Sequence, residues 1–147
     1  MTKDVILSIS GVQFDVSGDE PTQVITGADY YFKNGKHFVT YEETVPETGE
    51  SVKNTIKIAG DRVDVIKHGA QSVHMVFEKD KKNVTYYDTP YGSLFIGIQT
   101  FDIDFQEDDL NINTEIGYAL EVNDSHLSDC RISLNIKSKE DKTFRLQ

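Results

Sequence analysis

The feature that most constrains the fold of this chain is a regular succession of β-type segments. About ten segments rich in Val, Ile, Tyr, Phe and Thr follow one another, with short turns between them and no convincing helical pattern. We place them at residues 4–13, 23–33, 36–45, 51–59, 62–68, 72–78, 83–88, 93–105, 111–122 and 130–138. Such an unbroken run usually forms antiparallel strands that close into a barrel or fold into a sandwich.

We therefore predict an all-β fold, a single antiparallel meander of about ten strands closed into a barrel. Asn34-Gly35 and Gly60-Asp61 are typical of two-residue hairpin turns. The 147 residues suit one domain, so we expect a single barrel over residues 1–147. Residues 139–147 are charged, and we expect them to form a loose tail or to extend the last strand.

Charge and cysteine content limit the classes of function. Lys plus Arg number 15 against 25 Asp plus Glu, a net charge of −10, and no basic patch is visible along the chain. We therefore expect no nucleic-acid partner. Cys130 is the only cysteine, which rules out an internal disulfide and fits a reducing, cytoplasmic location. No signal-peptide pattern and no run of about 20 apolar residues is present, so we expect no membrane span.

Hairpin geometry predicts which side chains share the interior of the barrel. A turn at Gly60-Asp61 places Asn54 opposite Lys67, with apolar pairs before it. A five-residue loop at 46–50 would place Glu42 opposite Asn54. The same counting pairs the sixth segment with the seventh, Phe77 with Val84 and Val73 with Asp88 among others. The resulting rows of side chains are apolar at one end of the predicted barrel, its floor, and polar at the other end, its mouth.

The polar row is the candidate binding site. We expect the mouth and the interior beneath it to be formed by Glu42, Asn54, Lys67, Tyr86, Asp88 and Tyr118. Such a group could orient the polar head of a ligand while the apolar rows hold its body. Two alternatives stay open. A Lys between two carboxylates is equally a structural ion pair, and most small barrels fill their interiors with side chains.

Metal and cofactor sites are not indicated. The four histidines fall on different segments without ligand spacing, and one cysteine does not make a zinc site. The acidic run from Asp102 to Asp109 lacks the Gly of a calcium loop. No nucleophile elbow, phosphate loop or dinucleotide motif occurs, so we predict no cofactor and no catalytic residues.

The eighth segment is apolar on both faces. Leu94, Ile96 and Ile98 lie on one face, and Phe95, Phe101, Ile103 and Phe105 lie on the other. Its outer aromatic side chains need a cover, which either residues 14–22 or a second copy of the chain could supply. We therefore expect a homodimer through this strand as one arrangement.

Several residues together resemble the YwiB-like proteins. They are Tyr41-Glu42-Glu43, the Gly60–Val63 hairpin leading to His68-Gly69, Phe77, and Thr89-Pro90-Tyr91-Gly92 leading into Thr100. The resemblance extends from about residue 4 to residue 137. It implies a small cytoplasmic bacterial protein with a calycin-like, lipocalin-type β-barrel and no assigned activity.

Our leading hypothesis is non-catalytic binding of a small, partly apolar molecule inside the barrel. The alternative is a filled barrel that acts as a protein-interaction module through the eighth strand or its acidic loops. An enzyme that uses the mouth carboxylates as acid and base ranks last, because no nucleophile–base pair or metal cluster is legible.

Overall fold

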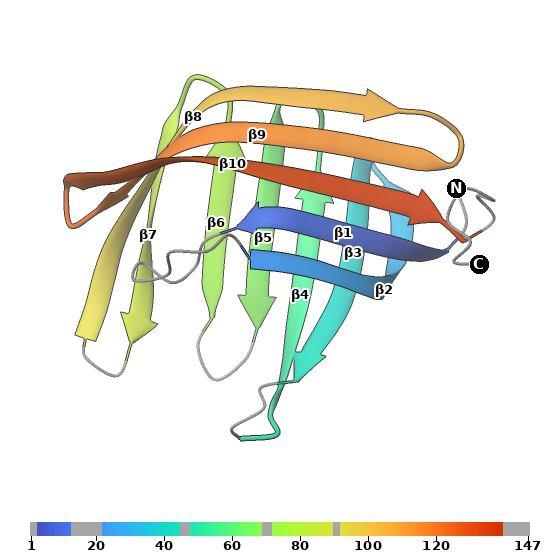
Figure 1. Ribbon diagram of the computed structural model, residues 1–147, viewed down its shortest axis with the longest axis horizontal. Coiled ribbons are helices and arrows are strands. Elements are labelled where there is room, and N and C mark those ends of the chain that lie inside the picture. The colour runs from blue at the N-terminus through green and yellow to red at the C-terminus, as the bar shows by residue number, and fades with distance from the viewer. Residues whose placement is uncertain (1–2, 13–21, 45–47, 69–71, 90–91, 140–147) are drawn as a thin grey trace.

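The computed structural model contains ten β-strands and, in the part of the chain that it describes, no helix (Figure 1). It describes residues 3–12, 22–44, 48–68, 72–89 and 92–139. The strands are β1 (Asp4–Val12), β2 (Thr22–Lys33), β3 (Lys36–Thr44), β4 (Ser51–Ile58), β5 (Arg62–His68), β6 (Val73–Glu78), β7 (Lys82–Thr89), β8 (Gly92–Glu107), β9 (Asn111–Val122) and β10 (Ser125–Ser138). Within these ranges nothing helical is long and apolar enough to cross a membrane.

All ten strands belong to one sheet that curls into a nearly closed barrel (Figure 1). Every ladder is antiparallel, and the order is β6-β5-β4-β3-β2-β1-β10-β9-β8-β7. The first and last strands are neighbours, with Val5 opposite Ser138, so the beginning of β1 lies beside the end of β10. The predicted all-β meander is confirmed. Most of the expected tail, residues 140–147, lies outside the described residues.

The seam of the barrel lies between β6 and β7, which form no ladder in the described residues. Their hairpin closes one end of the seam, because the amide of Asp80 donates to the carbonyl of Thr100 at 3.0 Å and the amide of Thr100 donates to the carbonyl of Lys81 at 3.1 Å. From that hairpin the two strands run apart (Figure 1). The expected pairing of Phe77 with Val84 is therefore wrong, and β7 pairs with β8 instead.

Alternation along each strand sends apolar side chains inward, as a barrel with one buried face requires. The predicted register between β4 and β5 is confirmed, with Asn54 opposite Lys67. In the next ladder Val63 of β5 lies opposite Phe77 of β6. The interior residues are Val5, Leu7, Ile9, Val39, Ile56, Ile58, Val63, Met75, Phe77, Ile96, Ile98, Ile112, Ile116, Tyr118, Leu120, Ile132, Leu134 and Ile136, with a few others at the ends.

A β-bulge changes the face of the second half of β8. The register shifts between Thr100 and Asp102, so one extra residue is inserted and the alternation reverses. Ile103 and Phe105, which we expected outside with Phe101, therefore turn toward the core and are partly buried against it. Sequence alternation alone does not reveal such an insertion. Phe101 stays outside and is half exposed.

Aromatic residues close the end of the barrel nearest the β2–β3 hairpin. His37 is 5% exposed, and its Nδ1 shares a 2.7 Å hydrogen bond with the hydroxyl of Tyr30. Its Nε2 lies 3.4 Å from Glu107, and its ring contacts Phe32 and Phe105. Burial lowers the pKa of His37, while Glu107 acts in the opposite direction. The histidine is therefore a structural residue of the barrel end.

Candidate functional site

Around Phe77 and Ile132 the interior of the barrel is filled by its own side chains. Among the described residues the void that remains at its centre is about 20 Å³, and apolar side chains such as Phe77, Ile56 and Ile132 surround it. A space of this size has room for about one water molecule, and the water would find few polar partners there. A small organic molecule has no room inside this part of the structure.

A polar group nevertheless lies at the inner surface, near the β3–β4 connection. Asn54 is fully buried on β4, and its Nδ2 donates to Oε1 of Glu43 at 2.8 Å. The ammonium group of Lys67 on β5 donates to the same oxygen at 3.0 Å. Oδ1 of Asn54 is buried and has no hydrogen-bond partner among the described residues. Burial and the nearby Glu43 carboxylate raise the pKa of Tyr41 to about 12.

The chemistry available to this group is limited. It combines an ion pair, an amide and a protonated phenol, and none of these is a nucleophile next to a base. The Glu43 side chain is 39% exposed, so the ion pair with Lys67 is partly screened by water. The arrangement fixes the strand ends in register more readily than it performs a reaction.

The structure brings Asn54 and Lys67 together as expected, but Glu43 replaces Glu42. The connection from β3 to β4 is one residue longer than we assumed, since Thr44 pairs with Ser51 and Asn54 pairs with Tyr41. A shift of one residue turns the whole strand over. Glu42 therefore lies outside and exposed, opposite Lys53. The sequence offered little to choose between the faces, because both faces of β3 carry apolar and acidic residues.

Of the other three predicted residues, Tyr118 and Tyr86 lie on opposite faces of the sheet. Tyr118 is buried inside the barrel, where its ring packs edge-on against Phe77 at 5.0 Å. Tyr86 is on the outer face of β7, 66% exposed, and its ring lies 5.3 Å from that of Phe95. Asp88 is on β7, but its side chain lies outside what the structure describes. The predicted mouth is thus not one group.

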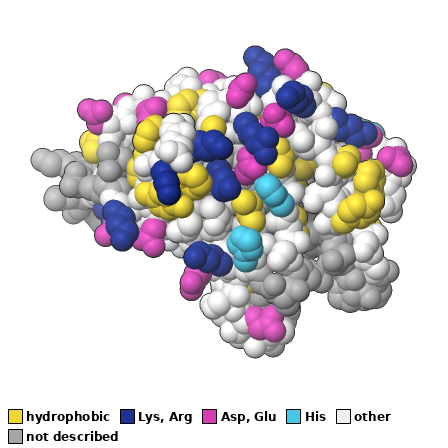
Figure 2. Space-filling model, turned by 180° about the vertical axis from the view of Figure 1, so that it is seen from behind, with side chains coloured by type: hydrophobic (Ala, Val, Ile, Leu, Met, Phe, Trp, Pro, Cys, Tyr) yellow, Lys and Arg dark blue, Asp and Glu magenta, His cyan; other side chains and the backbone are white. Residues whose placement is uncertain are grey.

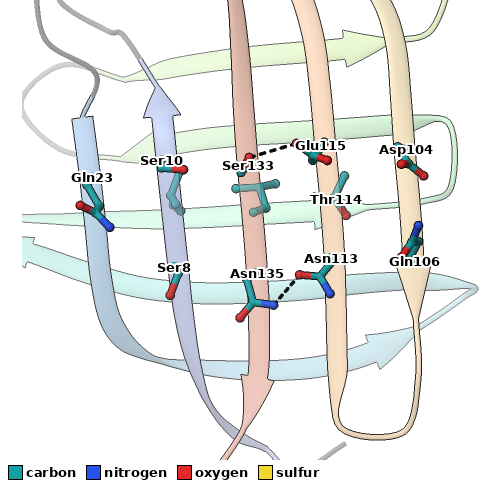
Figure 3. Close-up of a pocket in the computed structure, with 12 residues that line it drawn as sticks. Ser8, Ser10, Gln23, Asp104, Gln106, Asn113, Thr114, Glu115, Ser133 and Asn135 are labelled. Carbon is teal, nitrogen blue, oxygen red and sulfur yellow. Dashed lines mark hydrogen bonds between the residues drawn. The ribbon is translucent and has the colours of Figure 1, made fainter. Parts of the chain in front are cut away.

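A polar groove of about 350 Å³ crosses the outer face of the sheet from β2 to β8 (Figure 3). Its polar side chains are Ser8, Ser10, Gln23, Asp104, Gln106, Asn113, Thr114, Glu115, Ser133 and Asn135. Asn135 donates to Asn113 at 2.6 Å, and Ser133 donates to Glu115 at 3.4 Å, so part of this surface is already satisfied internally. The described residues contain no group of three or more His, Cys, Asp or Glu that could hold a metal ion.

Large apolar side chains are exposed on the last two strands of the sheet order. The β7–β8 surface consists of the exposed side chains of Val84, Tyr86 and Phe101 together with Phe95, which is partly buried. The exposed fractions are 52% for Val84, 66% for Tyr86 and 50% for Phe101. An apolar patch is visible at the β7 side of the molecule in Figure 2. Beside it Lys82 and Glu121 form a 2.6 Å ion pair, so its rim carries no net charge at that point.

Comparison with known proteins identifies the family. The model of the domain of unknown function DUF1934 matches residues 7–134. The chain belongs to the DUF1934 family. A crystal structure of the ywiB protein from Bacillus subtilis is similar to it, with a TM-score of 0.73, 20% sequence identity and coverage of 92% of each chain. No curated protein matches the chain.

These matches confirm the resemblance to YwiB-like proteins and the barrel fold. A likeness at 20% identity carries the fold alone, and the DUF1934 description assigns no activity. The function therefore has to be argued from the surface and the interior of this chain.

Proposed function

We propose that this protein is an interaction module, a filled barrel that binds a protein partner on its outside, and that the partner is a second copy of the chain. The observation that carries the proposal is the combination of a central void of about 20 Å³ with an exposed apolar surface on β7 and β8. Contiguous exposed apolar side chains on a monomer indicate an interaction site. The leading alternative, a ligand inside the barrel, lacks the volume that small-molecule sites need.

Charge supports a second copy as the partner. The chain carries a net charge of −10, so two copies repel each other over most of their surfaces. The β7–β8 surface is apolar, and the Lys82–Glu121 ion pair neutralises the charges beside it. Two acidic copies can approach there with little repulsion, and a two-fold axis would place the same surface on both sides.

The open edge of β7 adds a second source of affinity. In the described residues β7 is hydrogen-bonded to β8 alone, so its other edge presents backbone groups that a strand can pair with. Strand addition at such an edge is a common way for β-proteins to bind one another. The single cysteine, Cys130, supports a reducing cytoplasm as the location, and this stays part of the proposal.

Sedimentation equilibrium on two matched serine variants tests the proposal. Tyr86 and Ile25 are both 66% exposed, but Ile25 lies on β2, away from the β7–β8 surface. We expect the native chain to dimerise, Tyr86→Ser to weaken the dimer about tenfold or more, and Ile25→Ser to leave it unchanged. A native chain that stays monomeric at about 100 µM would refute the second copy as partner. If both variants weakened the dimer equally, the β7–β8 surface would be refuted as the interface.

A further inference from the structure

A hollow of about 330 Å³ lies on the outer face of strands β3 to β6. The β3–β6 hollow is lined by Lys36, Lys57, Ala59, Arg62, Asp64 and His74. Three permanent cations thus stand against one carboxylate, in a chain whose overall charge is −10. Lys, Arg and His side chains gather across the middle of this face in Figure 2. The sequence showed no basic patch because the cations come from separate strands.

The fold assembles the hollow from the ends of neighbouring strands. Lys36 begins β3, Lys57 lies near the end of β4, and Arg62 begins β5 after the tight turn at Gly60. Phe38, Lys57 and Asp64 stand side by side across these three strands. Ala59 has the smallest side chain of the lining, so it leaves space between the longer side chains around it.

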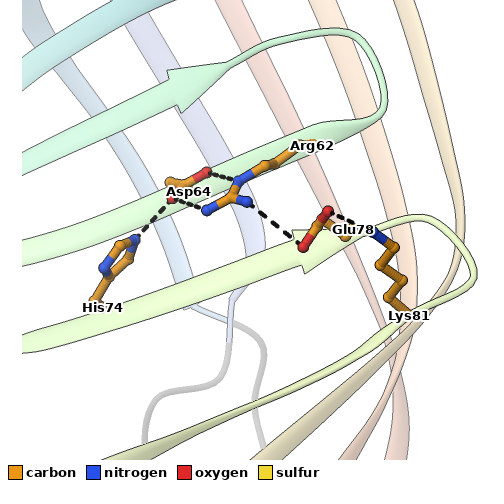
Figure 4. A network of polar contacts seen from close by, with 5 residues as sticks. All are labelled: Arg62, Asp64, His74, Glu78 and Lys81. Atoms are coloured by element: carbon orange, nitrogen blue, oxygen red, sulfur yellow. Dashed lines mark hydrogen bonds and ion pairs between the residues drawn. The ribbon is translucent and has the colours of Figure 1, made fainter.

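One wall of the hollow is held rigid by a network around Asp64 (Figure 4). Arg62 donates to both carboxylate oxygens of Asp64, at 2.8 and 3.1 Å, and Nε2 of His74 lies 2.8 Å from one of them. Asp64 is 6% exposed, and burial by itself raises its pKa. The hydrogen bonds from Arg62 and His74 outweigh burial and hold the pKa below its usual value. The carboxylate therefore stays ionised and holds the Arg62 and His74 side chains in place.

The network extends along β6 but does not include the two lysines of the hollow. Glu78 lies 3.6 Å from Arg62 and 3.4 Å from Lys81, so it balances charge at one end (Figure 4). Lys36 and Lys57 form no ion pair with any carboxylate in the described ranges. The ammonium group of Lys57 instead lies 5.7 Å from the centre of the Phe38 ring.

We propose that the β3–β6 hollow binds a tetrahedral dianion, the phosphate group of a small organic molecule. Lys36 and Lys57 make the principal contacts, and Arg62, held in place by Asp64, supplies a fixed positive wall. A planar carboxylate ligand is favoured where two parallel N–H groups of an arginine are free to donate to it. In Arg62 that pair of N–H groups already donates to Asp64. Lysines act as point charges and suit a tetrahedral oxyanion. The hollow is larger than phosphate alone requires, which leaves room for an organic group.

This site lies on strands other than those of the β7–β8 surface, so it goes beyond the proposed dimer. Either proposal can fail without affecting the other. Protein labelled with ¹⁵N is titrated with inorganic phosphate and with phenyl phosphate while its amide resonances are followed. We expect saturable shifts confined to the amides around residues 36, 57–64 and 74, with phenyl phosphate binding more tightly. Shifts spread over the whole surface, or tighter binding of malonate than of phosphate, would overturn the proposal.

Two variants and one control separate the site from general charge. Lys36→Gln with Lys57→Gln should weaken phosphate binding about tenfold, and Ala59→Leu, which changes no charge, should fill the hollow and weaken binding as well. Lys137→Gln on β10 removes one charge elsewhere and should change binding by about twofold or less. Circular dichroism checks that each variant is folded. Phosphate binding by Lys137→Gln that is as weak as binding by the double variant would refute the assignment of the site.

A phosphate group can also belong to a lipid, so one more measurement separates the two sources. Vesicles that contain phosphatidic acid are sedimented with the protein. The proposal predicts that phenyl phosphate binds and that the vesicles leave the protein in the supernatant. Protein that sediments with vesicles but does not bind phenyl phosphate would overturn the small molecule as ligand.

Discussion

Replacing Phe77 by alanine tests whether the interior of the barrel is a packed core. Phe77 is 1% exposed, and its ring packs against Tyr118 with the centroids 5.0 Å apart. Buried Phe→Ala substitutions cost about 3–5 kcal/mol, which includes the lost aromatic contact. Phe77 borders a void of only about 20 Å³, so its packed neighbours have little freedom to move into the space that its ring would leave. We therefore expect Phe77→Ala to lower the free energy of unfolding by about 4 kcal/mol.

The loss is measured by urea unfolding followed by circular dichroism, with the free energy of unfolding extrapolated to water. Phe101→Ala is the control, because Phe101 is half exposed on the outer face and should cost about 1 kcal/mol or less. Benzene should bind the new cavity and stabilise Phe77→Ala but not the native chain. A loss below about 1 kcal/mol for Phe77→Ala would mean that the interior is already open, and the reasoning from a filled barrel would fail.

Four further substitutions and titrations follow from single contacts. The buried hydroxyl of Tyr118 meets no hydrogen-bond partner of good geometry among the described residues, so Tyr118→Phe should raise the free energy of unfolding by about 1 kcal/mol; a loss would show that the hydroxyl is satisfied. Glu43→Gln removes only a partly exposed ion pair with Lys67 and should cost about 1 kcal/mol or less by urea unfolding, whereas a much larger loss would mean that the pair is more buried than its exposure indicates. Burial holds the pKa of His37 low, so the unfolded chain takes up the proton first. The stability that neutral His37 provides is therefore complete above about pH 6.5 and falls as the pH drops toward its folded pKa; an NMR titration with a normal or raised pKa would contradict this. Tyr41 should ionise near pH 12 in an ultraviolet titration, and Tyr41→Phe should remove that step.

The strands could be predicted from the sequence because turn residues and alternation act locally. The turn at Gly60-Asp61 fixes the register of β4 and β5 by its length alone, and Asn54 stands opposite Lys67 as the count requires. Gly60 has a φ of 65°, a conformation that glycine adopts without strain. Where the turn is short and its residues are distinctive, the sequence determines the pairing.

The candidate site could be predicted less well because it depends on long connections and on closure. One residue of error in the connection after Thr44 exchanged Glu42 for Glu43 at the inner surface. The bulge after Thr100 reversed the faces of Ile103 and Phe105, and no residue type marks such an insertion. The lining of the β3–β6 hollow comes one or two residues at a time from four successive strands and the turn at Ala59, so its cations form no cluster along the sequence.

Native mass spectrometry of protein purified without refolding, compared with the same sample after denaturation, tests the central claim most directly. A filled barrel that binds on its outside predicts a dimer whose mass is twice that of the denatured chain, with no molecule retained in the barrel. A monomer that carries an additional mass of a few hundred daltons, lost on denaturation, would contradict this account and return the function to the barrel interior.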